Sequence, residues 1–452
     1  MDPTAAPPTD DPGEDLSIDE ALALATSLHA ADHLEPAAEI YRRVLELVPE
    51  HPDALHFMGM LAHAQGRTDE ALRLMSRSVE LVPDHANFHS NLGNLMLQTE
   101  CFAQADREYR AALALDRDRP DTLHNYAVLL KAFGLYEEAE QCLLRAVQLA
   151  PDFTDACITL SSVYARTGRP EDALVQSNQV LRRQPLDARA REIQSLAYVR
   201  LGCLDEAAAV FRDWLAIEPD NPRALHHLAA CTGVAVPVRA SDAYVQSVFD
   251  AFSQRFDSRL ASLEYRAPTL VGEAVGGCIG APTANLGVLD VGCGTGLCAP
   301  LLRPFAARLE GVDLSAGMLG QADRRGLYDA LHRAELTAFM DAHPNRFDLV
   351  VSADTLVYFG AISAALCAAA RTLRAGGHLC FTVEALAEDA TTDYRLCHHG
   401  RYAHSRGYVA TALGEAGLVL LDIKRESLRH EGGEPVAGWL VLAQKPQQPA
   451  LA

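Results

Sequence analysis

An acid, a glycine-rich turn and a second acid follow one another in a pattern that suits a nucleoside ligand. Asp290 lies in an apolar run that leads into Gly292, Gly294 and Gly296, and Asp313 ends a second apolar run 23 residues after Asp290. Glycines remove Cβ atoms where a ligand lies against the main chain, and a carboxylate at a strand end can accept both hydroxyls of a ribose. The third glycine comes one residue earlier than in the dinucleotide fingerprint. Asp290 would repel a pyrophosphate there but could hold a cationic amino-acid moiety.

Four elements in this order resemble the class I methyltransferases that use S-adenosylmethionine. Residues 290–296 are similar to the glycine-rich first motif of that family, and Asp313 is similar to its ribose-binding acid. Residues 347–354 are similar to the fourth-strand motif, and residues 373–379 to the turn before the fifth strand. The resemblance covers roughly residues 240 to 446. It implies a Rossmann-like domain with S-adenosyl-L-methionine as its cofactor.

A narrower resemblance spans most of the chain. Residues 248–257, 400–405 and 428–438 look like a group of bacterial methyltransferases that carry tetratricopeptide repeats. That group is defined by sequence more than by activity. The resemblance therefore implies no particular methyl acceptor.

The resemblance also implies a set of cofactor contacts around the two acids. Met318 stands where the family flanks the adenine, although a methionine there is as readily part of the core, and Asp313 can also be interpreted as a helix N-cap. Ala334 and Glu335 are expected to complete the adenine contacts. The expected cofactor-binding residues are Asp290, Gly292, Cys293, Gly294, Thr295, Gly296, Asp313, Leu314, Met318, Ala334, Glu335 and Asp354.

Candidates for proton transfer follow the fifth expected strand. A base is needed only if the methyl-accepting atom starts protonated, as in an alcohol or a carboxylic acid. His404 is the preferred base, and Tyr402 and Glu384 are the other expected catalytic residues. The alternative is a surface loop with a helix N-cap at Ser405.

Candidates for acceptor binding come from the same region. Arg401 and Arg429 are expected to bind a carboxylate or phosphate of the acceptor, with His399 beside them. Either arginine can instead be a structural ion-pair partner of Glu431 or Glu434.

The second half of the chain alternates strands and helices, which predicts a parallel sheet with helices on both faces. Ligands of such sheets bind at the carboxyl ends of the strands, where these candidates fall. Residues 241–263 have the apolar spacing of a helix, and the resemblance implies that Tyr244 and Phe256 cover the cofactor. The expected strands are 287–291, 308–313, 347–352, 377–384, 418–423 and 437–443.

The first half has a period of 34 residues, which is the signature of tetratricopeptide repeats. One register holds a small residue where two helices cross, namely Ala37, Ala71, Ala105, Ala139, Ala173 and Ala207. Other registers hold a turn glycine between the helices and a proline after the second helix. Six repeats are expected, starting near residues 18, 52, 86, 120, 154 and 188, with a capping helix at 222–231. His226 and His227 in that helix suit an exposed end of the array.

The array can be purely architectural, or its concave groove can bind a protein or peptide. Asn91 and Asn125 fall at equivalent positions of neighbouring repeats and could grip a ligand backbone, since an amide both donates and accepts. We favour partner binding slightly, with these two asparagines as the partner-binding residues. A basic clamp for a carboxylate is not expected, because lysine is nearly missing.

Charge and cysteine content exclude several function classes. The formal net charge is −21, of which residues 1–235 contribute −17 (20 Lys and Arg, 37 Asp and Glu). Such a surface repels phosphate backbones, so nucleic acid is not an expected partner. The 11 cysteines show no Cys-x-x-Cys pair, which argues against a metal site and a disulfide framework. No secretory signal and no apolar span of membrane length is visible, so we expect a cytoplasmic protein.

These observations predict an all-α superhelix followed by a Rossmann-like α/β domain. The expected boundaries are a disordered tail at 1–17, repeats at 18–234, the methyltransferase domain at 235–446 and a tail at 447–452. The expected function is methyl transfer with a repeat array that recruits a protein. Two alternatives stay open: an assembly protein that keeps the fold without turnover, and an enzyme for a small biosynthetic molecule. The acceptor and the oligomeric state do not follow from the sequence.

Overall fold

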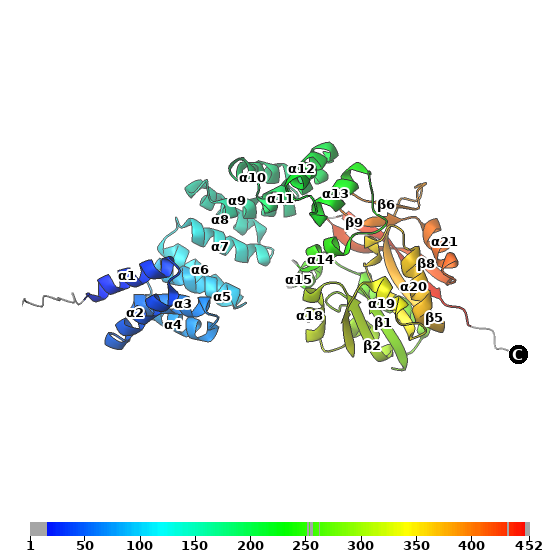
Figure 1. The fold of residues 1–452 in the computed structure, drawn as a ribbon, viewed down its shortest axis with the longest axis horizontal. Helices are drawn as coiled ribbons and strands as arrows, with labels where there is room; N and C mark the ends of the chain where they lie inside the picture. Colours follow the sequence, from blue (N-terminus) through cyan, green and yellow to red (C-terminus); the bar gives the residue numbers. More distant parts are fainter. Residues whose placement is uncertain (1–15, 251–252, 254–255, 262, 432–433, 448–452) are drawn as a thin grey trace, which may run out of the picture. The chain divides into compact units, whose positions relative to one another are not determined.

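The computed structural model describes the chain from residue 16 to residue 447, except for residues 251–252, 254–255, 262 and 432–433 (Figure 1). By compactness the chain divides into two units, residues 1–193 and residues 194–452, and each is described by itself. The tails expected at 1–17 and 447–452 lie almost wholly outside the described residues. Ser17 is described and caps the first helix: its side chain accepts from Glu20 N, and the Glu20 carboxylate accepts from Ser17 N.

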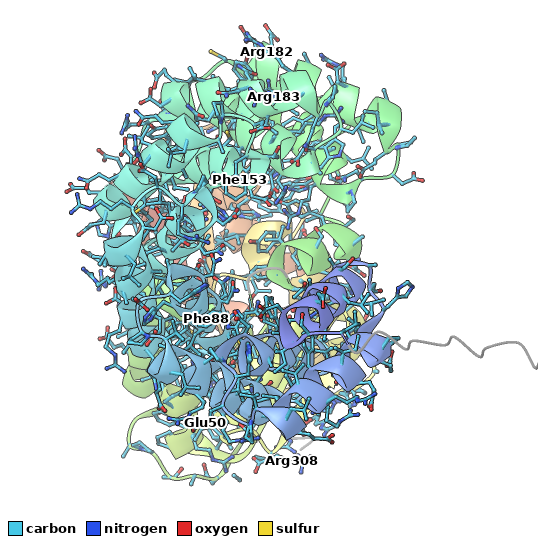
Figure 2. The ribbon with its side chains drawn as sticks, turned by 90° about the vertical axis from the view of Figure 1, so that its left-hand side faces the viewer. Glu50, Phe88, Phe153, Arg182, Arg183 and Arg308 are labelled. Atoms are coloured by element: carbon cyan, nitrogen blue, oxygen red, sulfur yellow. The ribbon has the colours of Figure 1, made fainter. Side chains whose placement is uncertain are left out.

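The first unit is a run of helix pairs, each pair packed on the next. Its side chains are drawn in Figure 2, where Phe88 and Phe153 mark two of the repeats. The helix α11 (Ala188–Arg200) crosses the boundary between the units. The helices before it are α1 (Ile18–Ala30), α2 (Leu34–Leu47), α3 (Pro52–Ala64), α4 (Thr68–Leu81), α5 (Ala86–Gln98), α6 (Phe102–Leu115), α7 (Pro120–Ala132), α8 (Tyr136–Leu149), α9 (Thr154–Arg166) and α10 (Pro170–Arg183).

The predicted repeat period is confirmed by packing and by backbone conformation. All six alanines of the small-residue register are fully buried. A Cβ on Gly59 would lie 2.5 Å from Met75 Cγ, which shows how closely the paired helices cross. The turn register has a positive φ at every repeat, including the two repeats where the residue is not glycine: Asp32, Gly66, Glu100, Gly134, Gly168 and Gly202.

The second unit begins with helices and continues into a nine-stranded sheet of order β3-β2-β1-β4-β5-β7-β6, with β9 paired to β5 and β8 paired to β9. Its helices include α12 (Leu204–Ile217), α13 (Pro222–Thr232), α14 (Asp242–Asp250), α15 (Phe256–Ala261), α16 (Ala267–Ile279), α17 (Ala299–Leu302), α18 (Ala316–Arg324), α19 (Leu336–Asp341), α20 (Ser363–Thr372) and α21 (Arg406–Glu415). The strands are β1 (Leu286–Val291), β2 (Ala306–Asp313), β3 (Ala330–Arg333), β4 (Phe347–Ser352), β5 (Leu373–Ala385), β6 (Tyr394–Leu396), β7 (Tyr402–His404), β8 (Val419–Glu431) and β9 (Glu434–Gln444).

Helices cover both faces of this sheet because its inner strands are apolar on both sides. Leu289 and Val350 pack in one core cluster with α19, α20 and α21. Their neighbours Val288 and Leu349 pack in the other cluster with α16 and α17. The side chains of a strand alternate between faces, so consecutive apolar residues fill both layers.

The sheet is mixed, whereas the sequence predicted a parallel one. β9 pairs antiparallel with both β5 and β8. Only residues 432–433 separate β8 from β9, and a connection that short can join only antiparallel strands. The strands β3, β6 and β7 were not predicted because each has only three or four residues.

The helix α13 corrects a second expectation, since it is not an exposed end of the array. His226 is 3% exposed, and its Nε2 lies 2.8 Å from the carbonyl oxygen of Gly400, just before β7. Its ring also stacks on Tyr244 of α14 at a centroid distance of 3.9 Å. The histidines of α13 therefore pack against the α/β sheet region of their own unit.

Candidate functional site

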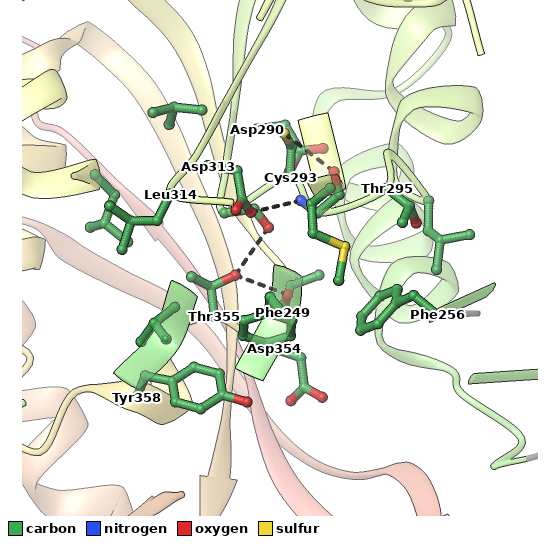
Figure 3. A pocket seen from close by; sticks show the side chains of 18 of the residues that line it. Phe249, Phe256, Asp290, Cys293, Thr295, Asp313, Leu314, Asp354, Thr355 and Tyr358 are labelled. Carbon is green, nitrogen blue, oxygen red and sulfur yellow. Dashed lines mark hydrogen bonds between the residues drawn. The ribbon is translucent and has the colours of Figure 1, made fainter. Parts of the chain in front are cut away.

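A cavity opens at the carboxyl ends of β1, β2 and β4, where the strand order places three strand-to-helix turns side by side (Figure 3). Asp290, Asp313 and Asp354 each lie at one of these strand ends and line the cavity. The sheet thus brings together acids that lie 23 and 41 residues apart along the chain.

The glycine turn after β1 forms the floor of this cavity. Gly292 has φ +69°, and a Cβ on it would lie 2.3 Å from Cγ2 of Thr355. Gly294 has φ +54°, and a Cβ on it would meet no atom within 4 Å. The first glycine is therefore required by packing inside the fold, while the second leaves its main chain open to a ligand.

Asp313 braces the same turn from β2. Its Oδ2 accepts from Gly294 N at 3.0 Å, and its Oδ1 accepts from Ser315 N at 2.8 Å. Burial raises the pKa of the Asp313 carboxyl, although these backbone N–H groups act in the opposite direction. Each carboxylate oxygen has a second lone pair, so both can still accept a hydroxyl of a ligand.

Asp290 is almost fully buried beneath the turn. Its Oδ2 accepts from the hydroxyl of Tyr328 at 2.6 Å. Burial raises the pKa of Asp290 to about 7, even though the Tyr328 hydroxyl favours the ionised form. A cationic group bound nearby would lower the pKa again and keep the carboxylate charged.

The helices α14 and α15 lie over one side of the cavity. Phe249 and Phe256 line it, and two acids attach this cover to the strand ends. Asp250 Oδ1 accepts from the Ser315 hydroxyl, and Asp257 accepts from the Thr295 hydroxyl. Of the two aromatic residues expected to cover the cofactor, Phe256 lines the cavity, whereas Tyr244 stacks on His226 instead.

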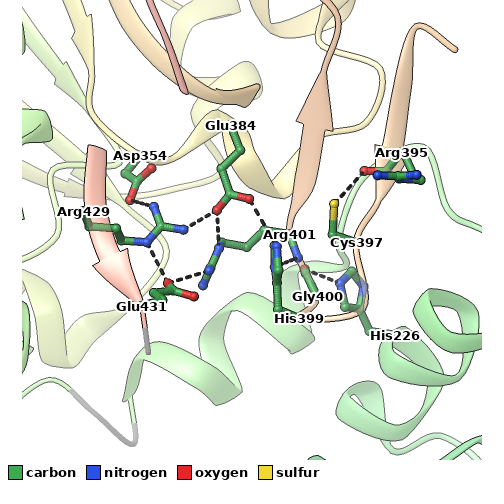
Figure 4. A network of polar contacts seen from close by, with 10 residues as sticks. All are labelled: His226, Asp354, Glu384, Arg395, Cys397, His399, Gly400, Arg401, Arg429 and Glu431. Carbon is green, nitrogen blue, oxygen red and sulfur yellow. Dashed lines mark hydrogen bonds and ion pairs between the residues drawn. The ribbon is translucent and has the colours of Figure 1, made fainter. Parts of the chain in front are cut away.

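A cluster of charged side chains lies beside the cavity (Figure 4), and its members Asp354, Arg401 and Arg429 line the cavity wall. Arg429 Nη1 donates to Asp354 Oδ2 at 2.7 Å, Arg429 Nε donates to Glu431 at 2.7 Å, and Arg429 Nη2 donates to Glu384. Arg401 donates to Glu384 and to Glu431, each at 2.6 Å. We call Asp354, Glu384, Arg401, Arg429 and Glu431 the charge cluster. The pairing of both arginines with Glu431 is the structural alternative that the sequence left open.

The structure brings the expected cofactor residues together with one exception. Gly296 does not line the cavity, because it packs against Tyr328, whose Cε2 would lie 2.9 Å from an added Cβ. Met318 is 1% exposed and contributes to the wall as a buried side chain. The expected residues that line the cavity are Asp290, Gly292, Cys293, Gly294, Thr295, Asp313, Leu314, Met318, Ala334, Glu335 and Asp354.

The residues expected to perform proton transfer lie elsewhere. His404 is fully buried, and its Nε2 lies 2.8 Å from Phe359 O and 3.1 Å from Gly360 O. Burial lowers its pKa to about 4, so the ring is neutral and its Nε2–H is engaged by main chain. Tyr402 is fully buried too, and its hydroxyl donates to Pro237 O. Neither residue lines the cavity, and Glu384 reaches it only through its two arginines.

Of the residues expected to bind the acceptor, Arg401 and Arg429 line the cavity and His399 does not. His399 Nε2 lies 3.3 Å from Glu384 Oε2 on the outer side of the cluster. Sequence reasoning missed Phe249, Thr355 and Tyr358, which also line the cavity. Thr355 and Tyr358 directly follow the fourth-strand motif, and that proximity was the available signal.

The array holds the second pair of candidate residues, in α5 and α7. Asn91 Nδ2 lies 3.0 Å from His56 Nε2 of the preceding repeat. Asn125 Nδ2 donates to Asn94 Oδ1 at 2.9 Å. Both asparagines are half-buried, and Asn125 also lies within hydrogen-bonding reach of the His124 side chain. The two amides thus lie on neighbouring repeats, each held through its nitrogen.

Among the described residues, no group of three or more His, Cys, Asp or Glu side chains is arranged to hold a metal ion. Within the same part of the chain, every helix is too short or too polar to cross a lipid bilayer.

Comparison with family models agrees with the two-part architecture. Residues 289–381 match the model for a methyltransferase domain. Three models for tetratricopeptide repeats match residues 28–95, 120–153 and 158–222.

Curated relatives match part of this chain over part of their own length. Methyltransferase-like protein 27 of Homo sapiens is 43% identical over 84 residues, which are 18% of this chain and 34% of that protein. A ubiquinone biosynthesis O-methyltransferase of Thiobacillus denitrificans is 36% identical over 107 residues, which are 23% of this chain and 46% of that protein. The chain thus spans less than half the length of these relatives.

Two solved structures each align with part of the chain. One is YrrB, a tetratricopeptide-repeat protein with an unusual peptide-binding site, at 23% identity and a TM-score of 0.39 over 42% of this chain and 97% of its own. The other is an S-adenosylmethionine dependent methyltransferase from Mesorhizobium loti, at 19% identity and a TM-score of 0.32 over 38% of this chain and 97% of its own.

Proposed function

We propose that this chain, which joins tetratricopeptide repeats to a methyltransferase domain, transfers a methyl group from S-adenosyl-L-methionine, and that its repeats bind a protein partner or protein acceptor. The observation that supports this most is the brace between Asp313 and Gly294. A carboxylate with unused lone pairs and a glycine with an open main chain meet at the ends of two adjacent strands. That combination suits a nucleoside.

The residues at the cavity fit this cofactor part by part. Asp313 would accept the ribose hydroxyls, and the main chain around Gly294 would lie against the nucleoside. Asp290 would hold the cationic amino-acid end, since its elevated pKa falls when a cation binds beside it. Leu314, Ala334 and Glu335 would surround the base at the ends of β2 and β3.

The cofactor supplies a methyl group activated by its sulfonium, and the protein would position the acceptor. Holding an acceptor in line with that carbon can contribute about 7–11 kcal/mol of the barrier reduction. Phe249 and Phe256 on the cover would exclude water from the reacting atoms. Asp257 and Asp250 would keep the cover closed through Thr295 and Ser315.

The array is proposed to recruit a protein through α5 and α7, the helices that carry the two asparagines. The amide oxygens of Asn91 and Asn125 would accept N–H groups of an extended ligand backbone. Their amide nitrogens are already fixed by neighbouring repeats, which orients the oxygens in advance.

A small-molecule acceptor is the second candidate function. It is supported by the aromatic lining of the cavity, Phe249, Phe256, Tyr265 and Tyr358, and by the O-methyltransferase name of one relative. In that case the repeats would bind the enzyme to other proteins and would not bind the acceptor.

Calorimetric titration of S-adenosylmethionine and S-adenosylhomocysteine into the full chain tests the cofactor proposal. We expect saturable binding to the wild type and at least about 100-fold weaker binding to Asp313→Ala, because two charge-assisted hydrogen bonds are lost. Asp341→Ala is the matched control, since Asp341 pairs with Arg371 on the surface and lies outside the cavity. Equal affinities of the two variants would contradict the proposal.

Labelled methyl transfer in a cell lysate separates the candidate functions. We expect label in protein, reduced at least tenfold in the Asn91→Ala/Asn125→Ala variant and unchanged in Gln104→Ala, an exposed residue of α6. If the wild type and both variants transfer label only to small molecules, the result favours a small-molecule acceptor. Cofactor binding without any labelled product would favour an assembly protein.

A further inference from the structure

The three acids of the charge cluster are not equivalent. Glu384 and Glu431 each accept from both Arg401 and Arg429. Asp354 accepts from Arg429 alone through Oδ2, and its Oδ1 is buried without any donor among the described residues. Among the three acids Asp354 alone lines the cavity, so its unpartnered oxygen is the one that a ligand in the cavity could reach.

The backbone holds Asp354 in an unusual conformation. Its φ is +58°, which costs a non-glycine residue about 1–2 kcal/mol. The turn directly follows β4, and Asp354 N donates to the Thr382 hydroxyl of β5 at 2.8 Å. A strained residue fixed at the end of a central strand, with its side chain in a cavity, indicates a functional constraint.

Arg429 of the cluster is not available to an anionic acceptor. Every nitrogen of the Arg429 guanidinium already donates to a carboxylate, and its side chain is 3% exposed. With all members ionised, three acids and two arginines give the cluster a formal charge of −1. A net negative charge would repel a carboxylate or phosphate, contrary to the role expected for Arg429.

The directions of the pKa shifts also separate Asp354 from Glu384 and Glu431. Burial raises the pKa of Asp354, and Arg429 only partly offsets that effect. In Glu384 burial also acts upward, but Arg401 and Arg429 outweigh it and lower the pKa. In Glu431 the same two arginines lower the pKa to about 2 against the effect of burial. A proton that reaches the cluster would therefore go to Asp354.

Aromatic side chains lie beside Asp354 in the cavity (Figure 3). Phe249 of α14 packs edge-on against Tyr358 at a centroid distance of 5.5 Å, and Tyr265 lines the same cavity. Such a wall suits a flat apolar group. An aliphatic amine is a poor match, because a wall of net negative charge would hold it as an ammonium ion without a lone pair.

We propose, on the premise of the proposed function, that the methyl acceptor is an uncharged hydroxyl on an aromatic or apolar group and that the Asp354 carboxylate receives its proton. The hydroxyl oxygen forms the new bond to the methyl carbon. The carbon–sulfur bond breaks with its electron pair on sulfur, and the hydroxyl proton passes to Asp354. Arg429 positions Asp354 and keeps it ionised before the reaction.

The coloured phenol 4-nitrophenol tests this assignment, because it titrates near neutral pH and only its phenolate is yellow. The full-length protein is saturated with S-adenosylhomocysteine and titrated with the phenol at several pH values. We expect the bound probe to stay neutral, with its pKa raised by about one unit, a tenfold preference for the hydroxyl form. In Asp354→Asn that preference is lost, since the charge is removed while asparagine tolerates the left-handed backbone.

Asp341→Asn is the matched control and is expected to behave as the wild type, because this surface aspartate lies outside the cavity. A bound probe that turns yellow would overturn the proposal in favour of an anion site at the arginines. An unchanged preference in Asp354→Asn would also overturn it. If S-adenosylhomocysteine binds normally but 4-nitrophenol does not bind, the proposed class of acceptor is overturned, whereas the proposed cofactor site is not. Failure to bind S-adenosylhomocysteine would refute the proposed function itself.

Discussion

The two units of this protein place their charges differently. In the array, Arg77 pairs with Glu50 and Glu80, and all three side chains are at least 44% exposed. In the α/β unit, Arg429 is 3% exposed between three carboxylates. Exposed pairs contribute little to stability, whereas buried charges are costly unless every partner is present. Burial of Arg429 among carboxylates is therefore expected to cost stability, and Arg429 lies in the wall of the cavity.

The largest expected effect comes from removing a matched arginine in each unit. Arg429→Met would leave three carboxylates without their common partner and lower the free energy of unfolding by about 3–5 kcal/mol. Arg77→Met would change it by less than about 1 kcal/mol. The two tryptophans, Trp214 and Trp439, both lie in the second unit, so denaturant unfolding followed by their fluorescence reports the first change. Circular dichroism of the helices reports the second. Similar losses of unfolding free energy in both variants would contradict the contrast between the buried Arg429 and the exposed Arg77.

A smaller effect is expected from two glycines with a positive φ. Gly134→Ala in the array would cost about 1–2 kcal/mol, because an alanine is strained there but its Cβ meets no atom within 4 Å. Gly292→Ala has the same strain and a Cβ 2.3 Å from Thr355, which adds about 1–3 kcal/mol of overpacking. Thermal unfolding measures both. Only Gly292→Ala should also weaken S-adenosylhomocysteine binding, and equal binding by both variants would contradict the role of the turn.

The smallest effect concerns pH, where the two units should respond alike. Burial, with His85 beside the ring, lowers the pKa of His56 in the array from 6.5 to about 4. Burial, with His226 and Arg223 nearby, lowers the pKa of His227 in α13 from 6.5 to about 4. The folded state thus binds fewer protons than the unfolded state in this window, so stability falls as pH drops from 6.5 towards 4. At pH 5.5 the loss is about 1 kcal/mol per histidine.

Chemical denaturation at pH 7.5 and 5.5 measures this loss. His56→Gln should reduce the pH dependence of the array, and His227→Gln should reduce that of the second unit, where His404 keeps its own contribution. A variant that keeps the full pH dependence would show that its histidine is already neutral in the unfolded chain or charged in the folded one.

The elements that the sequence predicted are those with a local signature. The period of 34 predicts the repeats because each alanine of its register faces a neighbouring helix, and the structure buries all six. The glycine turn and Asp313 were visible because they follow apolar strands. β8 and β9 were predicted as strands, but their direction depends on the short hairpin between them.

The charge cluster could not be predicted from spacing. Asp354, Glu384 and Arg429 come from three strands or strand ends, and only their pairing distances show that the arginine is already occupied. His404 matched the residue type of a base, but its environment is set by Phe359 and Gly360, which lie 44 to 45 residues earlier. Residue type indicates which chemistry is possible, whereas burial and partners decide which residue performs it.

The contact between His226 and Gly400 has a consequence for how this protein can change over generations. Duplication or deletion of one 34-residue repeat before α11 would change the length of the array and leave α13, Tyr244 and Gly400 in contact. Recombination at residue 234 would instead give the sheet region a foreign helix in place of α13, which carries His226. The number of repeats can thus change during evolution without loss of this contact, whereas α13 and the sheet have to be kept together.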